Sequence, residues 1–167
     1  MDSKPGHKAL RRGRFPQQGS TYFITICTSG RMSLLTKLGV PELIFNQLQE
    51  QDEHMQLRAS VVMPDHVHFV SKLSDSSLDS TVRAFKGASS RAINLLLKRT
   101  GGVWQRGYFD HKFRSDDEMG PILHYMWNNP SNPGENFRCN KDDWLWFKSI
   151  VTKDVNYPSW LSSNPMG

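Results

Sequence analysis

The stretch MPDHVHFV, residues 63–70, places two histidines one residue apart within an apolar run. Successive side chains of a strand point to opposite faces, so we expect His66 and His68 to project from the same face of a sheet. Imidazole is the commonest metal ligand among side chains and readily titrates near neutral pH. The pair could hold a cation, carry a proton or merely line a polar face. A motif this short therefore needs partners elsewhere in the chain.

The segments around this stretch follow the periodicities of strands and helices in a definite order. Strand patterns occupy residues 20–28, 57–64, 65–73 and 107–115, and helical patterns occupy 40–55, 78–100 and 115–130. The Pro64-Asp65 pair predicts a tight antiparallel hairpin. The order β-α-β-β-α-β predicts an α+β, ferredoxin-like sandwich, followed here by an additional C-terminal helix and an irregular tail. In that topology the first and third strands lie in the middle of the sheet, and the third carries the histidine pair.

Length and composition predict one domain with a sizeable core in a chain of 167 residues. We divide the sequence into a basic flexible arm over 1–15, the main domain over 16–130, and an irregular tail over 131–167 packed on that domain. The two cysteines form no spacing motif, which favours a reducing cytoplasm without a disulfide framework. No apolar stretch is long enough to cross a bilayer, so we expect no membrane partner.

Positive charge is concentrated in two places. The net charge is +5, which makes an anionic partner plausible. Within the N-terminal arm and the 78–100 helix, the candidate phosphate-contacting cations are Arg12, Arg14, Arg83, Lys86, Arg91 and Lys98. A solvated surface is the ordinary explanation for such residues. The helical stripe nevertheless has no acidic residue alternating with it, and an unpaired basic stripe suits a polyanion.

The last predicted helix carries Tyr125 and Asn129, which are four residues apart and so lie one turn apart on one face. Taken singly, they are an ordinary packing residue and an ordinary helix terminator. Together with the histidines they would form a three-ligand cation site beside a phenol. A phenol has a pKa of about 10 and needs such assistance to act as a nucleophile at neutral pH. A His/His/Asn set without thiolates favours Mg²⁺ or Mn²⁺ over a closed structural zinc site.

In these residues the chain resembles the single-tyrosine transposases with an HUH (His-hydrophobic-His) motif, enzymes that move single-stranded DNA. The similarity is to the REP-associated tyrosine transposases in particular, over roughly residues 12–130. It is carried by MPDHVHF, by WQRGYFDHKFRSDDE followed by YMWNNP, and by FKGASSRAIN and GSTYFITICTSGR. One departure is Asp65, where the family often has Asn.

The resemblance implies a ferredoxin-like fold and a divalent cation held by His66 and His68. It also implies a tyrosine that attacks DNA to leave a 5′-phosphotyrosine and a free 3′-OH. Carried onto this sequence, Tyr125 is the nucleophile and Asn129 completes the coordination.

The leading interpretation is a metal-dependent, site-specific endonuclease and strand transferase, located in the cytoplasm at the nucleoid. Its substrates would be single-stranded DNA or hairpins of palindromic repeats. Trp104, Phe109 or Tyr108 could stack on unpaired bases, with Trp104 preferred, although a core position suits that indole equally well. Arg106 could reach a base edge or a phosphate.

Two other functions are compatible with parts of the pattern. A non-catalytic regulator that binds DNA hairpins would keep the basic residues and ignore the site, and the intact set of His66, His68, Tyr125 and Asn129 argues against it. A small metal-dependent phosphodiesterase would need neither the tyrosine nor the basic stripe. The sequence is compatible with a monomer or a homodimer.

Overall fold

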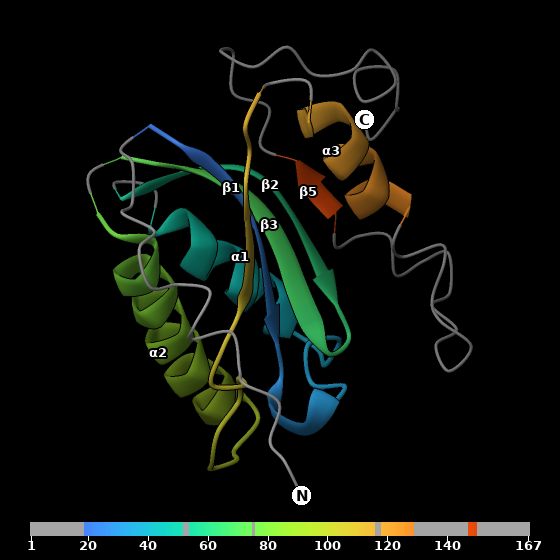
Figure 1. Cartoon of the computed structure of the whole chain (residues 1–167). Coiled ribbons are helices and arrows are strands. Elements are labelled where there is room, and N and C mark those ends of the chain that lie inside the picture. Colours follow the sequence, from blue (N-terminus) through green and yellow to red (C-terminus); the bar gives the residue numbers. More distant parts are fainter. Residues whose placement is uncertain (1–18, 52–53, 75, 116–117, 129–146, 150–167) are drawn as a thin grey trace, which may run out of the picture.

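The computed structural model of the chain describes residues 19–51, 54–74, 76–115, 118–128 and 147–149 (Figure 1). The elements in chain order are β1 (Thr21–Cys27), η1 (Ser29–Arg31), α1 (Val40–Gln49), β2 (Met55–Met63), β3 (His66–Leu73), α2 (Leu78–Leu96), β4 (Phe109–Lys112), α3 (Met119–Asn128) and β5 (Phe147–Ser149). The predicted α+β class and the order β-α-β-β-α-β with an added helix are confirmed. None of the described helices is both long enough and apolar enough to span a membrane.

The strands form one antiparallel sheet in the order β4-β1-β3-β2-β5. Within the four strands that the pattern predicted, β1 and β3 are central, as expected. The expectation of an irregular tail over 131–167 was wrong for residues 147–149, which pair with β2 as β5. The backbone groups on that edge of β2 are open to a further strand, and a segment of three residues is too short to show a period of two. The other tail residues and the 1–15 arm lie outside the described residues.

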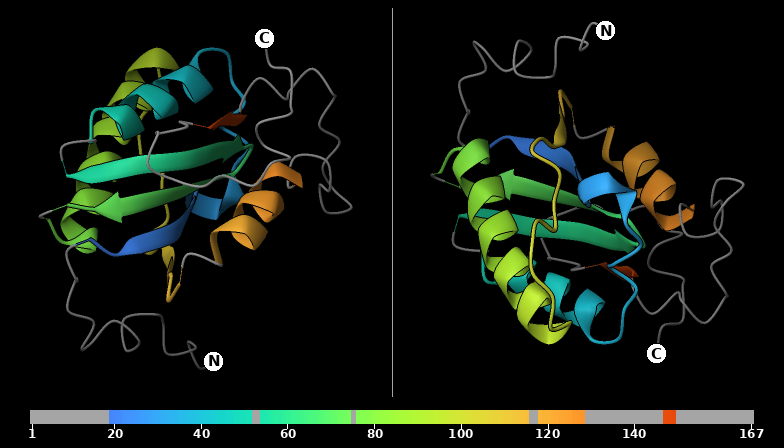
Figure 2. Two further views of the ribbon diagram at one scale, coloured as in Figure 1. Left: turned by 90° about the horizontal axis from the view of Figure 1, so that it is seen from above. Right: turned by 90° about the horizontal axis from the view of Figure 1, so that it is seen from below.

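Helices cover both faces of the sheet. Figures 1 and 2 show α1 and α2 on one face and α3 on the other. Alternate residues of the strands supply two separate cores, because the side chains of a strand alternate between faces. The core beneath α1 and α2 includes Ile24, Ile26, Val67, Phe69 and Phe85. The core beneath α3 includes Phe23, Val61, Val70, Leu123 and Met126.

The helices are shorter than the sequence patterns predicted. α1 ends at Gln49 because the chain must turn before β2 begins at Met55. α2 begins after Ser77, whose hydroxyl accepts a hydrogen bond from the backbone N–H of Ser80, and it ends at Leu96. α3 begins at Met119, so Pro121 lies in its first turn. Proline is tolerated there because the first backbone N–H groups of a helix have no intrahelical partner.

The hairpin between β2 and β3 is as tight as the Pro64-Asp65 pair predicted, since Met63 and His66 are directly paired. Its turn is tied to the segment that follows β1. The backbone N–H of Thr28 donates to the Asp65 carbonyl at 2.8 Å, and the N–H of Leu35 donates to the Pro64 carbonyl at 2.9 Å. These bonds bring Asp65 and the η1 segment to the same end of the sheet as His66.

Burial of α3 on the sheet leads to a first prediction. Leu123 of α3 is fully buried against the sheet, whereas Leu95 of α2 is 82% exposed. We expect Leu123→Ala to lower the free energy of unfolding by about 2–5 kcal/mol, because it removes buried methyl groups and leaves a cavity. The matched change Leu95→Ala should stay within about 0.5 kcal/mol of the wild type. Urea unfolding measures both values, and equal losses in the two variants would contradict the placement of α3.

Candidate metal and nucleophile site

The two histidines of β3 project toward the α3 side of the sheet, which confirms that they share a face. His66 is paired across the strands with Cys27 of β1, and His68 with Thr25. Their ring centroids are 4.6 Å apart and their Nε2 atoms are 3.1 Å apart. Both imidazoles therefore direct the same nitrogen toward one point.

Burial keeps these two imidazoles neutral. The pKa of His68 is lowered to about 3, mainly by desolvation and to a smaller extent by charge on His66 and Arg31. The pKa of His66 is also lowered by burial, although the hydrogen bond and charge of Asp65 oppose this and Arg31 adds to it. Neutral imidazole is the form that binds metal ions. The site thus presents its metal-binding protonation state at neutral pH.

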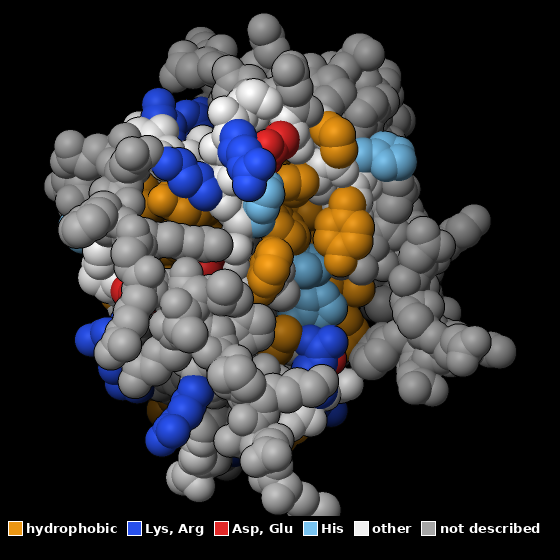
Figure 3. All heavy atoms as spheres, in the orientation of Figure 1, with side chains coloured by type: hydrophobic (Ala, Val, Ile, Leu, Met, Phe, Trp, Pro, Cys, Tyr) orange, Lys and Arg blue, Asp and Glu red, His pale blue; other side chains and the backbone are white. Residues whose placement is uncertain are grey.

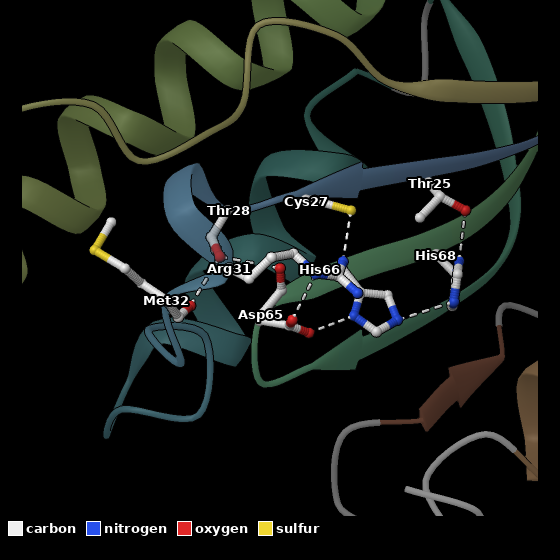
Figure 4. Close-up of polar contacts among 8 residues, drawn as sticks. All are labelled: Thr25, Cys27, Thr28, Arg31, Met32, Asp65, His66 and His68. Carbon is white, nitrogen blue, oxygen red and sulfur yellow. Dashed lines mark hydrogen bonds and ion pairs between the residues drawn. The ribbon is translucent and has the colours of Figure 1, made fainter. Parts of the chain in front are cut away.

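The Nδ1 atoms of both rings have partners from neighbouring elements (Figure 4). Nδ1 of His66 lies 2.6 Å from Oδ1 of Asp65, and Nδ1 of His68 lies 2.7 Å from Oγ1 of Thr25. A carboxylate only accepts, so Nδ1 of His66 carries its proton and Nε2 presents a lone pair. Nε2 of His68 then donates to that lone pair, and Nδ1 of His68 accepts from the Thr25 hydroxyl. A hydroxyl both donates and accepts, so Thr25 would equally support the opposite tautomer of His68.

Tyr125 of α3 lies beside this pair. Its ring centroid is 5.6 Å from that of His68 and 6.2 Å from that of Phe23, both in edge-on geometry, and the side chain is 52% exposed. The sheet thus holds one edge of the ring while the rest stays open to solvent. α3 is positioned by its buried residues and by a hydrogen bond at 2.8 Å between His111 Nε2 and Glu118 Oε2, which joins β4 to the residue before the helix.

The chain's described residues supply only part of a cation site. Among them, no three His, Cys, Asp or Glu side chains form a group able to hold a metal ion. Asn129, the predicted third ligand, lies outside the described residues. His66 already has the usual arrangement of a metal-ligating histidine, with Nδ1–H donated to Asp65 and Nε2 free to bind. His68 would match it in the tautomer that donates Nδ1–H to the Thr25 hydroxyl, and the two Nε2 atoms would then fit a divalent cation that takes its other ligands elsewhere.

Arg31 is a residue of this site that the sequence patterns did not single out. Its Nε lies 3.0 Å from Oδ2 of Asp65, and its Nη1 donates to Sγ of Cys27 at 2.8 Å. The contact depends on two distant turns meeting at one end of the sheet. A contact between two turns that are distant in sequence produces no periodic pattern from which it could be predicted.

Three of the predicted DNA-contacting residues meet on the α2 side of the sheet. Arg83, Lys86 and Arg106 line a half-open hollow of about 210 Å³ together with Asp79, Val82 and Tyr108. Lys86 is not directed outward, because its Nζ donates to the backbone carbonyls of Gln105, Arg106 and Gly107. Its ammonium group holds the segment before β4.

Two of the other predicted cations are not brought into this hollow. Arg91 and Lys98 are exposed at and beyond the C-terminal half of α2. Arg12 and Arg14 lie outside the described residues. The structure thus groups Arg83 and Arg106 and leaves the rest of the proposed stripe dispersed.

The expectation that Trp104 stacks on a DNA base was wrong. Trp104 is only 8% exposed, packs against Phe85 and donates its Nε1–H to Oγ of Ser89 at 2.9 Å. Of the three aromatic residues considered for base stacking, Phe109 is the exposed one, at 51%, on the same sheet face as the histidines and near Phe23. Figure 3 shows hydrophobic side chains and histidines together on this side of the molecule.

Comparisons with known proteins agree with this arrangement. The family model of IS200-like transposases matches residues 17–129. A REP-associated tyrosine transposase of Haemophilus influenzae is 28% identical over 167 residues, covering 89% of this chain and 90% of that protein. A REP-associated tyrosine transposase of Escherichia coli is 25% identical over 124 residues, covering 72% of each chain. The chain therefore belongs to the IS200-like transposase family and is an enzyme of the tyrosine transposase class.

Solved structures share the fold. A REP-associated tyrosine transposase bound to a REP hairpin superposes with a TM-score of 0.61 at 23% identity, covering 72% of both chains. A transposase of Deinococcus radiodurans gives a TM-score of 0.51 at 23% identity, covering 70% of this chain and 95% of that one.

The lowered pKa of His68 leads to a prediction about stability. Between its folded pKa of about 3 and its ordinary value of 6.5, the unfolded chain binds more protons than the folded one. The contribution of His68 to the free energy of unfolding is therefore fully present above its ordinary pKa of 6.5. It is lost as the pH falls from there toward the folded pKa, by at most about 1.4 kcal/mol per pH unit. Urea unfolding in buffers of decreasing pH should show a shallower loss for His68→Gln than for the wild type. The exposed His124 provides the matched variant His124→Gln, and identical slopes for His68→Gln and the wild type would contradict the assignment.

Proposed function

We propose that this chain is a metal-dependent, site-specific single-stranded DNA endonuclease and strand transferase. It would act on hairpins of palindromic repeats at the nucleoid and so carry out DNA transposition or repeat mobilisation. The observation that supports this most directly is the position of Tyr125 beside the histidine pair. The centroid of its ring lies 5.6 Å from that of His68, and the Nε2 atoms of His68 and His66 are 3.1 Å apart. A nucleophile candidate and a cation-ligand pair on separate elements thus converge on one point. The hairpin-bound structural neighbour supports the choice of substrate.

The proposed reaction is an exchange of phosphodiester bonds. Oη of Tyr125 loses its proton and attacks the scissile phosphorus, so that the Oη–P bond forms and the P–O3′ bond breaks. The 3′ oxygen takes up a proton and leaves as a 3′-OH, while the 5′ phosphate stays on the tyrosine. A second 3′-OH reverses the step and joins a new strand. The link to tyrosine preserves a phosphodiester bond, so rejoining requires no external energy source.

The proposed cofactor is Mg²⁺ or Mn²⁺, held by His66, His68 and Asn129. When bound, such a cation would polarise the phosphate and favour the ionised phenol. Asp65 and Thr25 contribute by holding the two imidazoles in a fixed orientation. Met126 and Leu123 hold α3, and with it Tyr125, against the same sheet face.

We propose that the DNA strand passes over the exposed edge of β4. Tyr108 and Phe109 are consecutive, and Tyr108 lines the hollow with Arg83 and Arg106 whereas Phe109 lies on the histidine side. One strand could therefore contact both surfaces. Phe109 would stack on an unpaired base next to the scissile phosphate, and the cations would bind phosphates. The other proposed phosphate contacts are Arg12, Arg14, Arg91 and Lys98, and Lys86 would act by positioning the backbone of the 105–107 segment.

The test of the proposed function is the trapping of a protein–DNA adduct. A hairpin oligonucleotide with a single-stranded flank is incubated with the full chain and Mn²⁺. We expect a cleaved strand and a covalent 5′-linked adduct from the wild type, and neither from Tyr125→Phe or in excess chelator. Tyr22→Phe is the matched control and should keep both products, because Tyr22 is buried in the core on the α1 and α2 side of the sheet, on the opposite face from the histidines. An adduct in Tyr125→Phe would contradict the mechanism, and hairpin binding without any cleavage by the wild type would favour a regulator.

Asn129→Ala should fail in a different way from Tyr125→Phe. The alanine variant keeps the nucleophile and loses one neutral ligand, so the residual adduct should increase with added Mn²⁺. Tyr125→Phe should not respond to the metal at any concentration. Equal insensitivity of both variants would remove Asn129 from the proposed ligand set.

The hollow on the α2 side predicts how binding depends on salt. We expect Arg83→Ala to weaken hairpin binding for every sequence and to reduce the slope of log affinity against log salt by about one, because one phosphate contact is lost. Lys37→Ala removes an exposed charge in the loop before α1 and should leave the slope as in the wild type. Unchanged slopes in both variants would place the DNA on another surface.

A further inference from the structure

The guanidinium of Arg31 lies at the His66 end of the histidine pair. Figure 4 shows it reaching from the η1 segment between Asp65 and Cys27. Its Nε is bonded to the Asp65 carboxylate and its Nη1 to the Cys27 sulfur, at 3.0 and 2.8 Å. Three different elements (η1, the β2–β3 turn and β1) therefore fix its position.

The backbone at Arg31 is held in an uncommon conformation. Its φ is +56°, in the left-handed region that residues other than glycine rarely adopt. The segment is kept in place by the Thr28 hydroxyl, which lies within hydrogen-bond distance of the carbonyls of Met32 and Asp65, at 2.8 and 3.0 Å. The turn that bears Arg31 is thus attached directly to the turn that bears Asp65, and this attachment offsets the cost of the conformation.

The charge of Arg31 acts on both imidazoles, since it lowers the pKa of each. A permanent cation at this place opposes the binding of a second cation by the histidines. Asp65 offsets only one positive charge, and it also accepts the Nδ1–H of His66. Two neighbouring positive charges become favourable when an anion lies between them.

The guanidinium has donors to offer such an anion. Of its five N–H groups, the two contacts to Asp65 and Cys27 use two, and the side chain is 54% exposed. The planar fork of arginine matches the spacing of two phosphate oxygens, which a lysine ammonium does not. The remaining donors of Arg31 therefore suit an anion with paired oxygens.

We propose that Arg31 is a phosphate-binding catalytic residue, whose guanidinium binds a non-bridging oxygen of the scissile phosphodiester on the His66 side of the histidine pair. Asp65 is its positioning residue. This inference rests on the proposed function, because it requires a DNA phosphate at the histidines. The charge of Asp65 is needed for this role, since an asparagine there could orient His66 but would carry no charge to hold the guanidinium.

The test compares Arg31→Gln, Arg31→Lys and the control Lys37→Gln in the full chain. One measurement is the single-turnover rate of adduct formation with a hairpin oligonucleotide and Mn²⁺. The other is the affinity for Mn²⁺ alone, by calorimetry without DNA. We expect Arg31→Gln to slow adduct formation by about 10²–10³-fold, the usual effect of removing one donor from a developing oxyanion. Its Mn²⁺ affinity should rise several-fold, because the repelling charge is gone.

The lysine variant separates charge from geometry. Arg31→Lys should keep the weak Mn²⁺ affinity of the wild type and react at an intermediate rate, and Lys37→Gln should match the wild type in both measurements. The proposal would be overturned if Arg31→Gln formed the adduct as fast as the wild type. It would also be overturned if Arg31→Gln bound Mn²⁺ more weakly than the wild type, because Arg31 would then serve to maintain the geometry of the histidines. A wild-type chain that forms no adduct would instead overturn the proposed function.

Discussion

The antiparallel pairing of β1 with β3 is the constraint on which the candidate site depends. Its register places Thr25 opposite His68 and Cys27 opposite His66. One strand therefore supplies the imidazoles, and the other supplies the Thr25 hydroxyl that bonds His68 and the Cys27 sulfur that accepts from Arg31. Both strands are central, flanked by β4 and β2. A shift by one residue would move both histidines to the opposite face, away from α3 and Tyr125. Buried apolar neighbours on both faces make such a shift costly, and the geometry of the pair follows from the packing of the sheet.

The same packing determines the charge state of the site. The imidazoles lie within a sheet face covered by α3, and their burial lowers the pKa of both. At His66 this lowering is larger than the rise in pKa caused by Asp65. The charged groups, Asp65 and Arg31, lie at the end of the sheet, where the hairpin turn and η1 meet. A neutral ligand pair beside a fixed ion pair is suited to a substrate that carries its own negative charge. The proposed phosphodiester substrate meets that requirement.

Features with a short repeat could be predicted from the sequence. The alternation in β3 gave the shared face of His66 and His68, and the order of strand and helix patterns gave the central places of β1 and β3. Tyr125 was predicted from its place on the last helix and from the family resemblance. Features that depend on contacts between distant segments could not be predicted in this way. Arg31 meets Asp65 only because two turns are bonded together, and Trp104 is buried because Ser89 and Phe85 of α2 receive its indole. β5 depends on an open edge of β2, which no local pattern reports.

The central claim is that Asp65 and Thr25 hold His66 and His68 as a neutral pair whose Nε2 atoms face one cation. Nitrogen-15 NMR of the histidine rings tests it most directly, because it distinguishes the two tautomers. Without metal, the account requires the proton of His66 on Nδ1 and that of His68 on Nε2. Mn²⁺ added below one equivalent should then broaden these two rings first, before the exposed ring of His124. A proton on Nε2 of His66, or equal broadening of the exposed ring, would contradict the account.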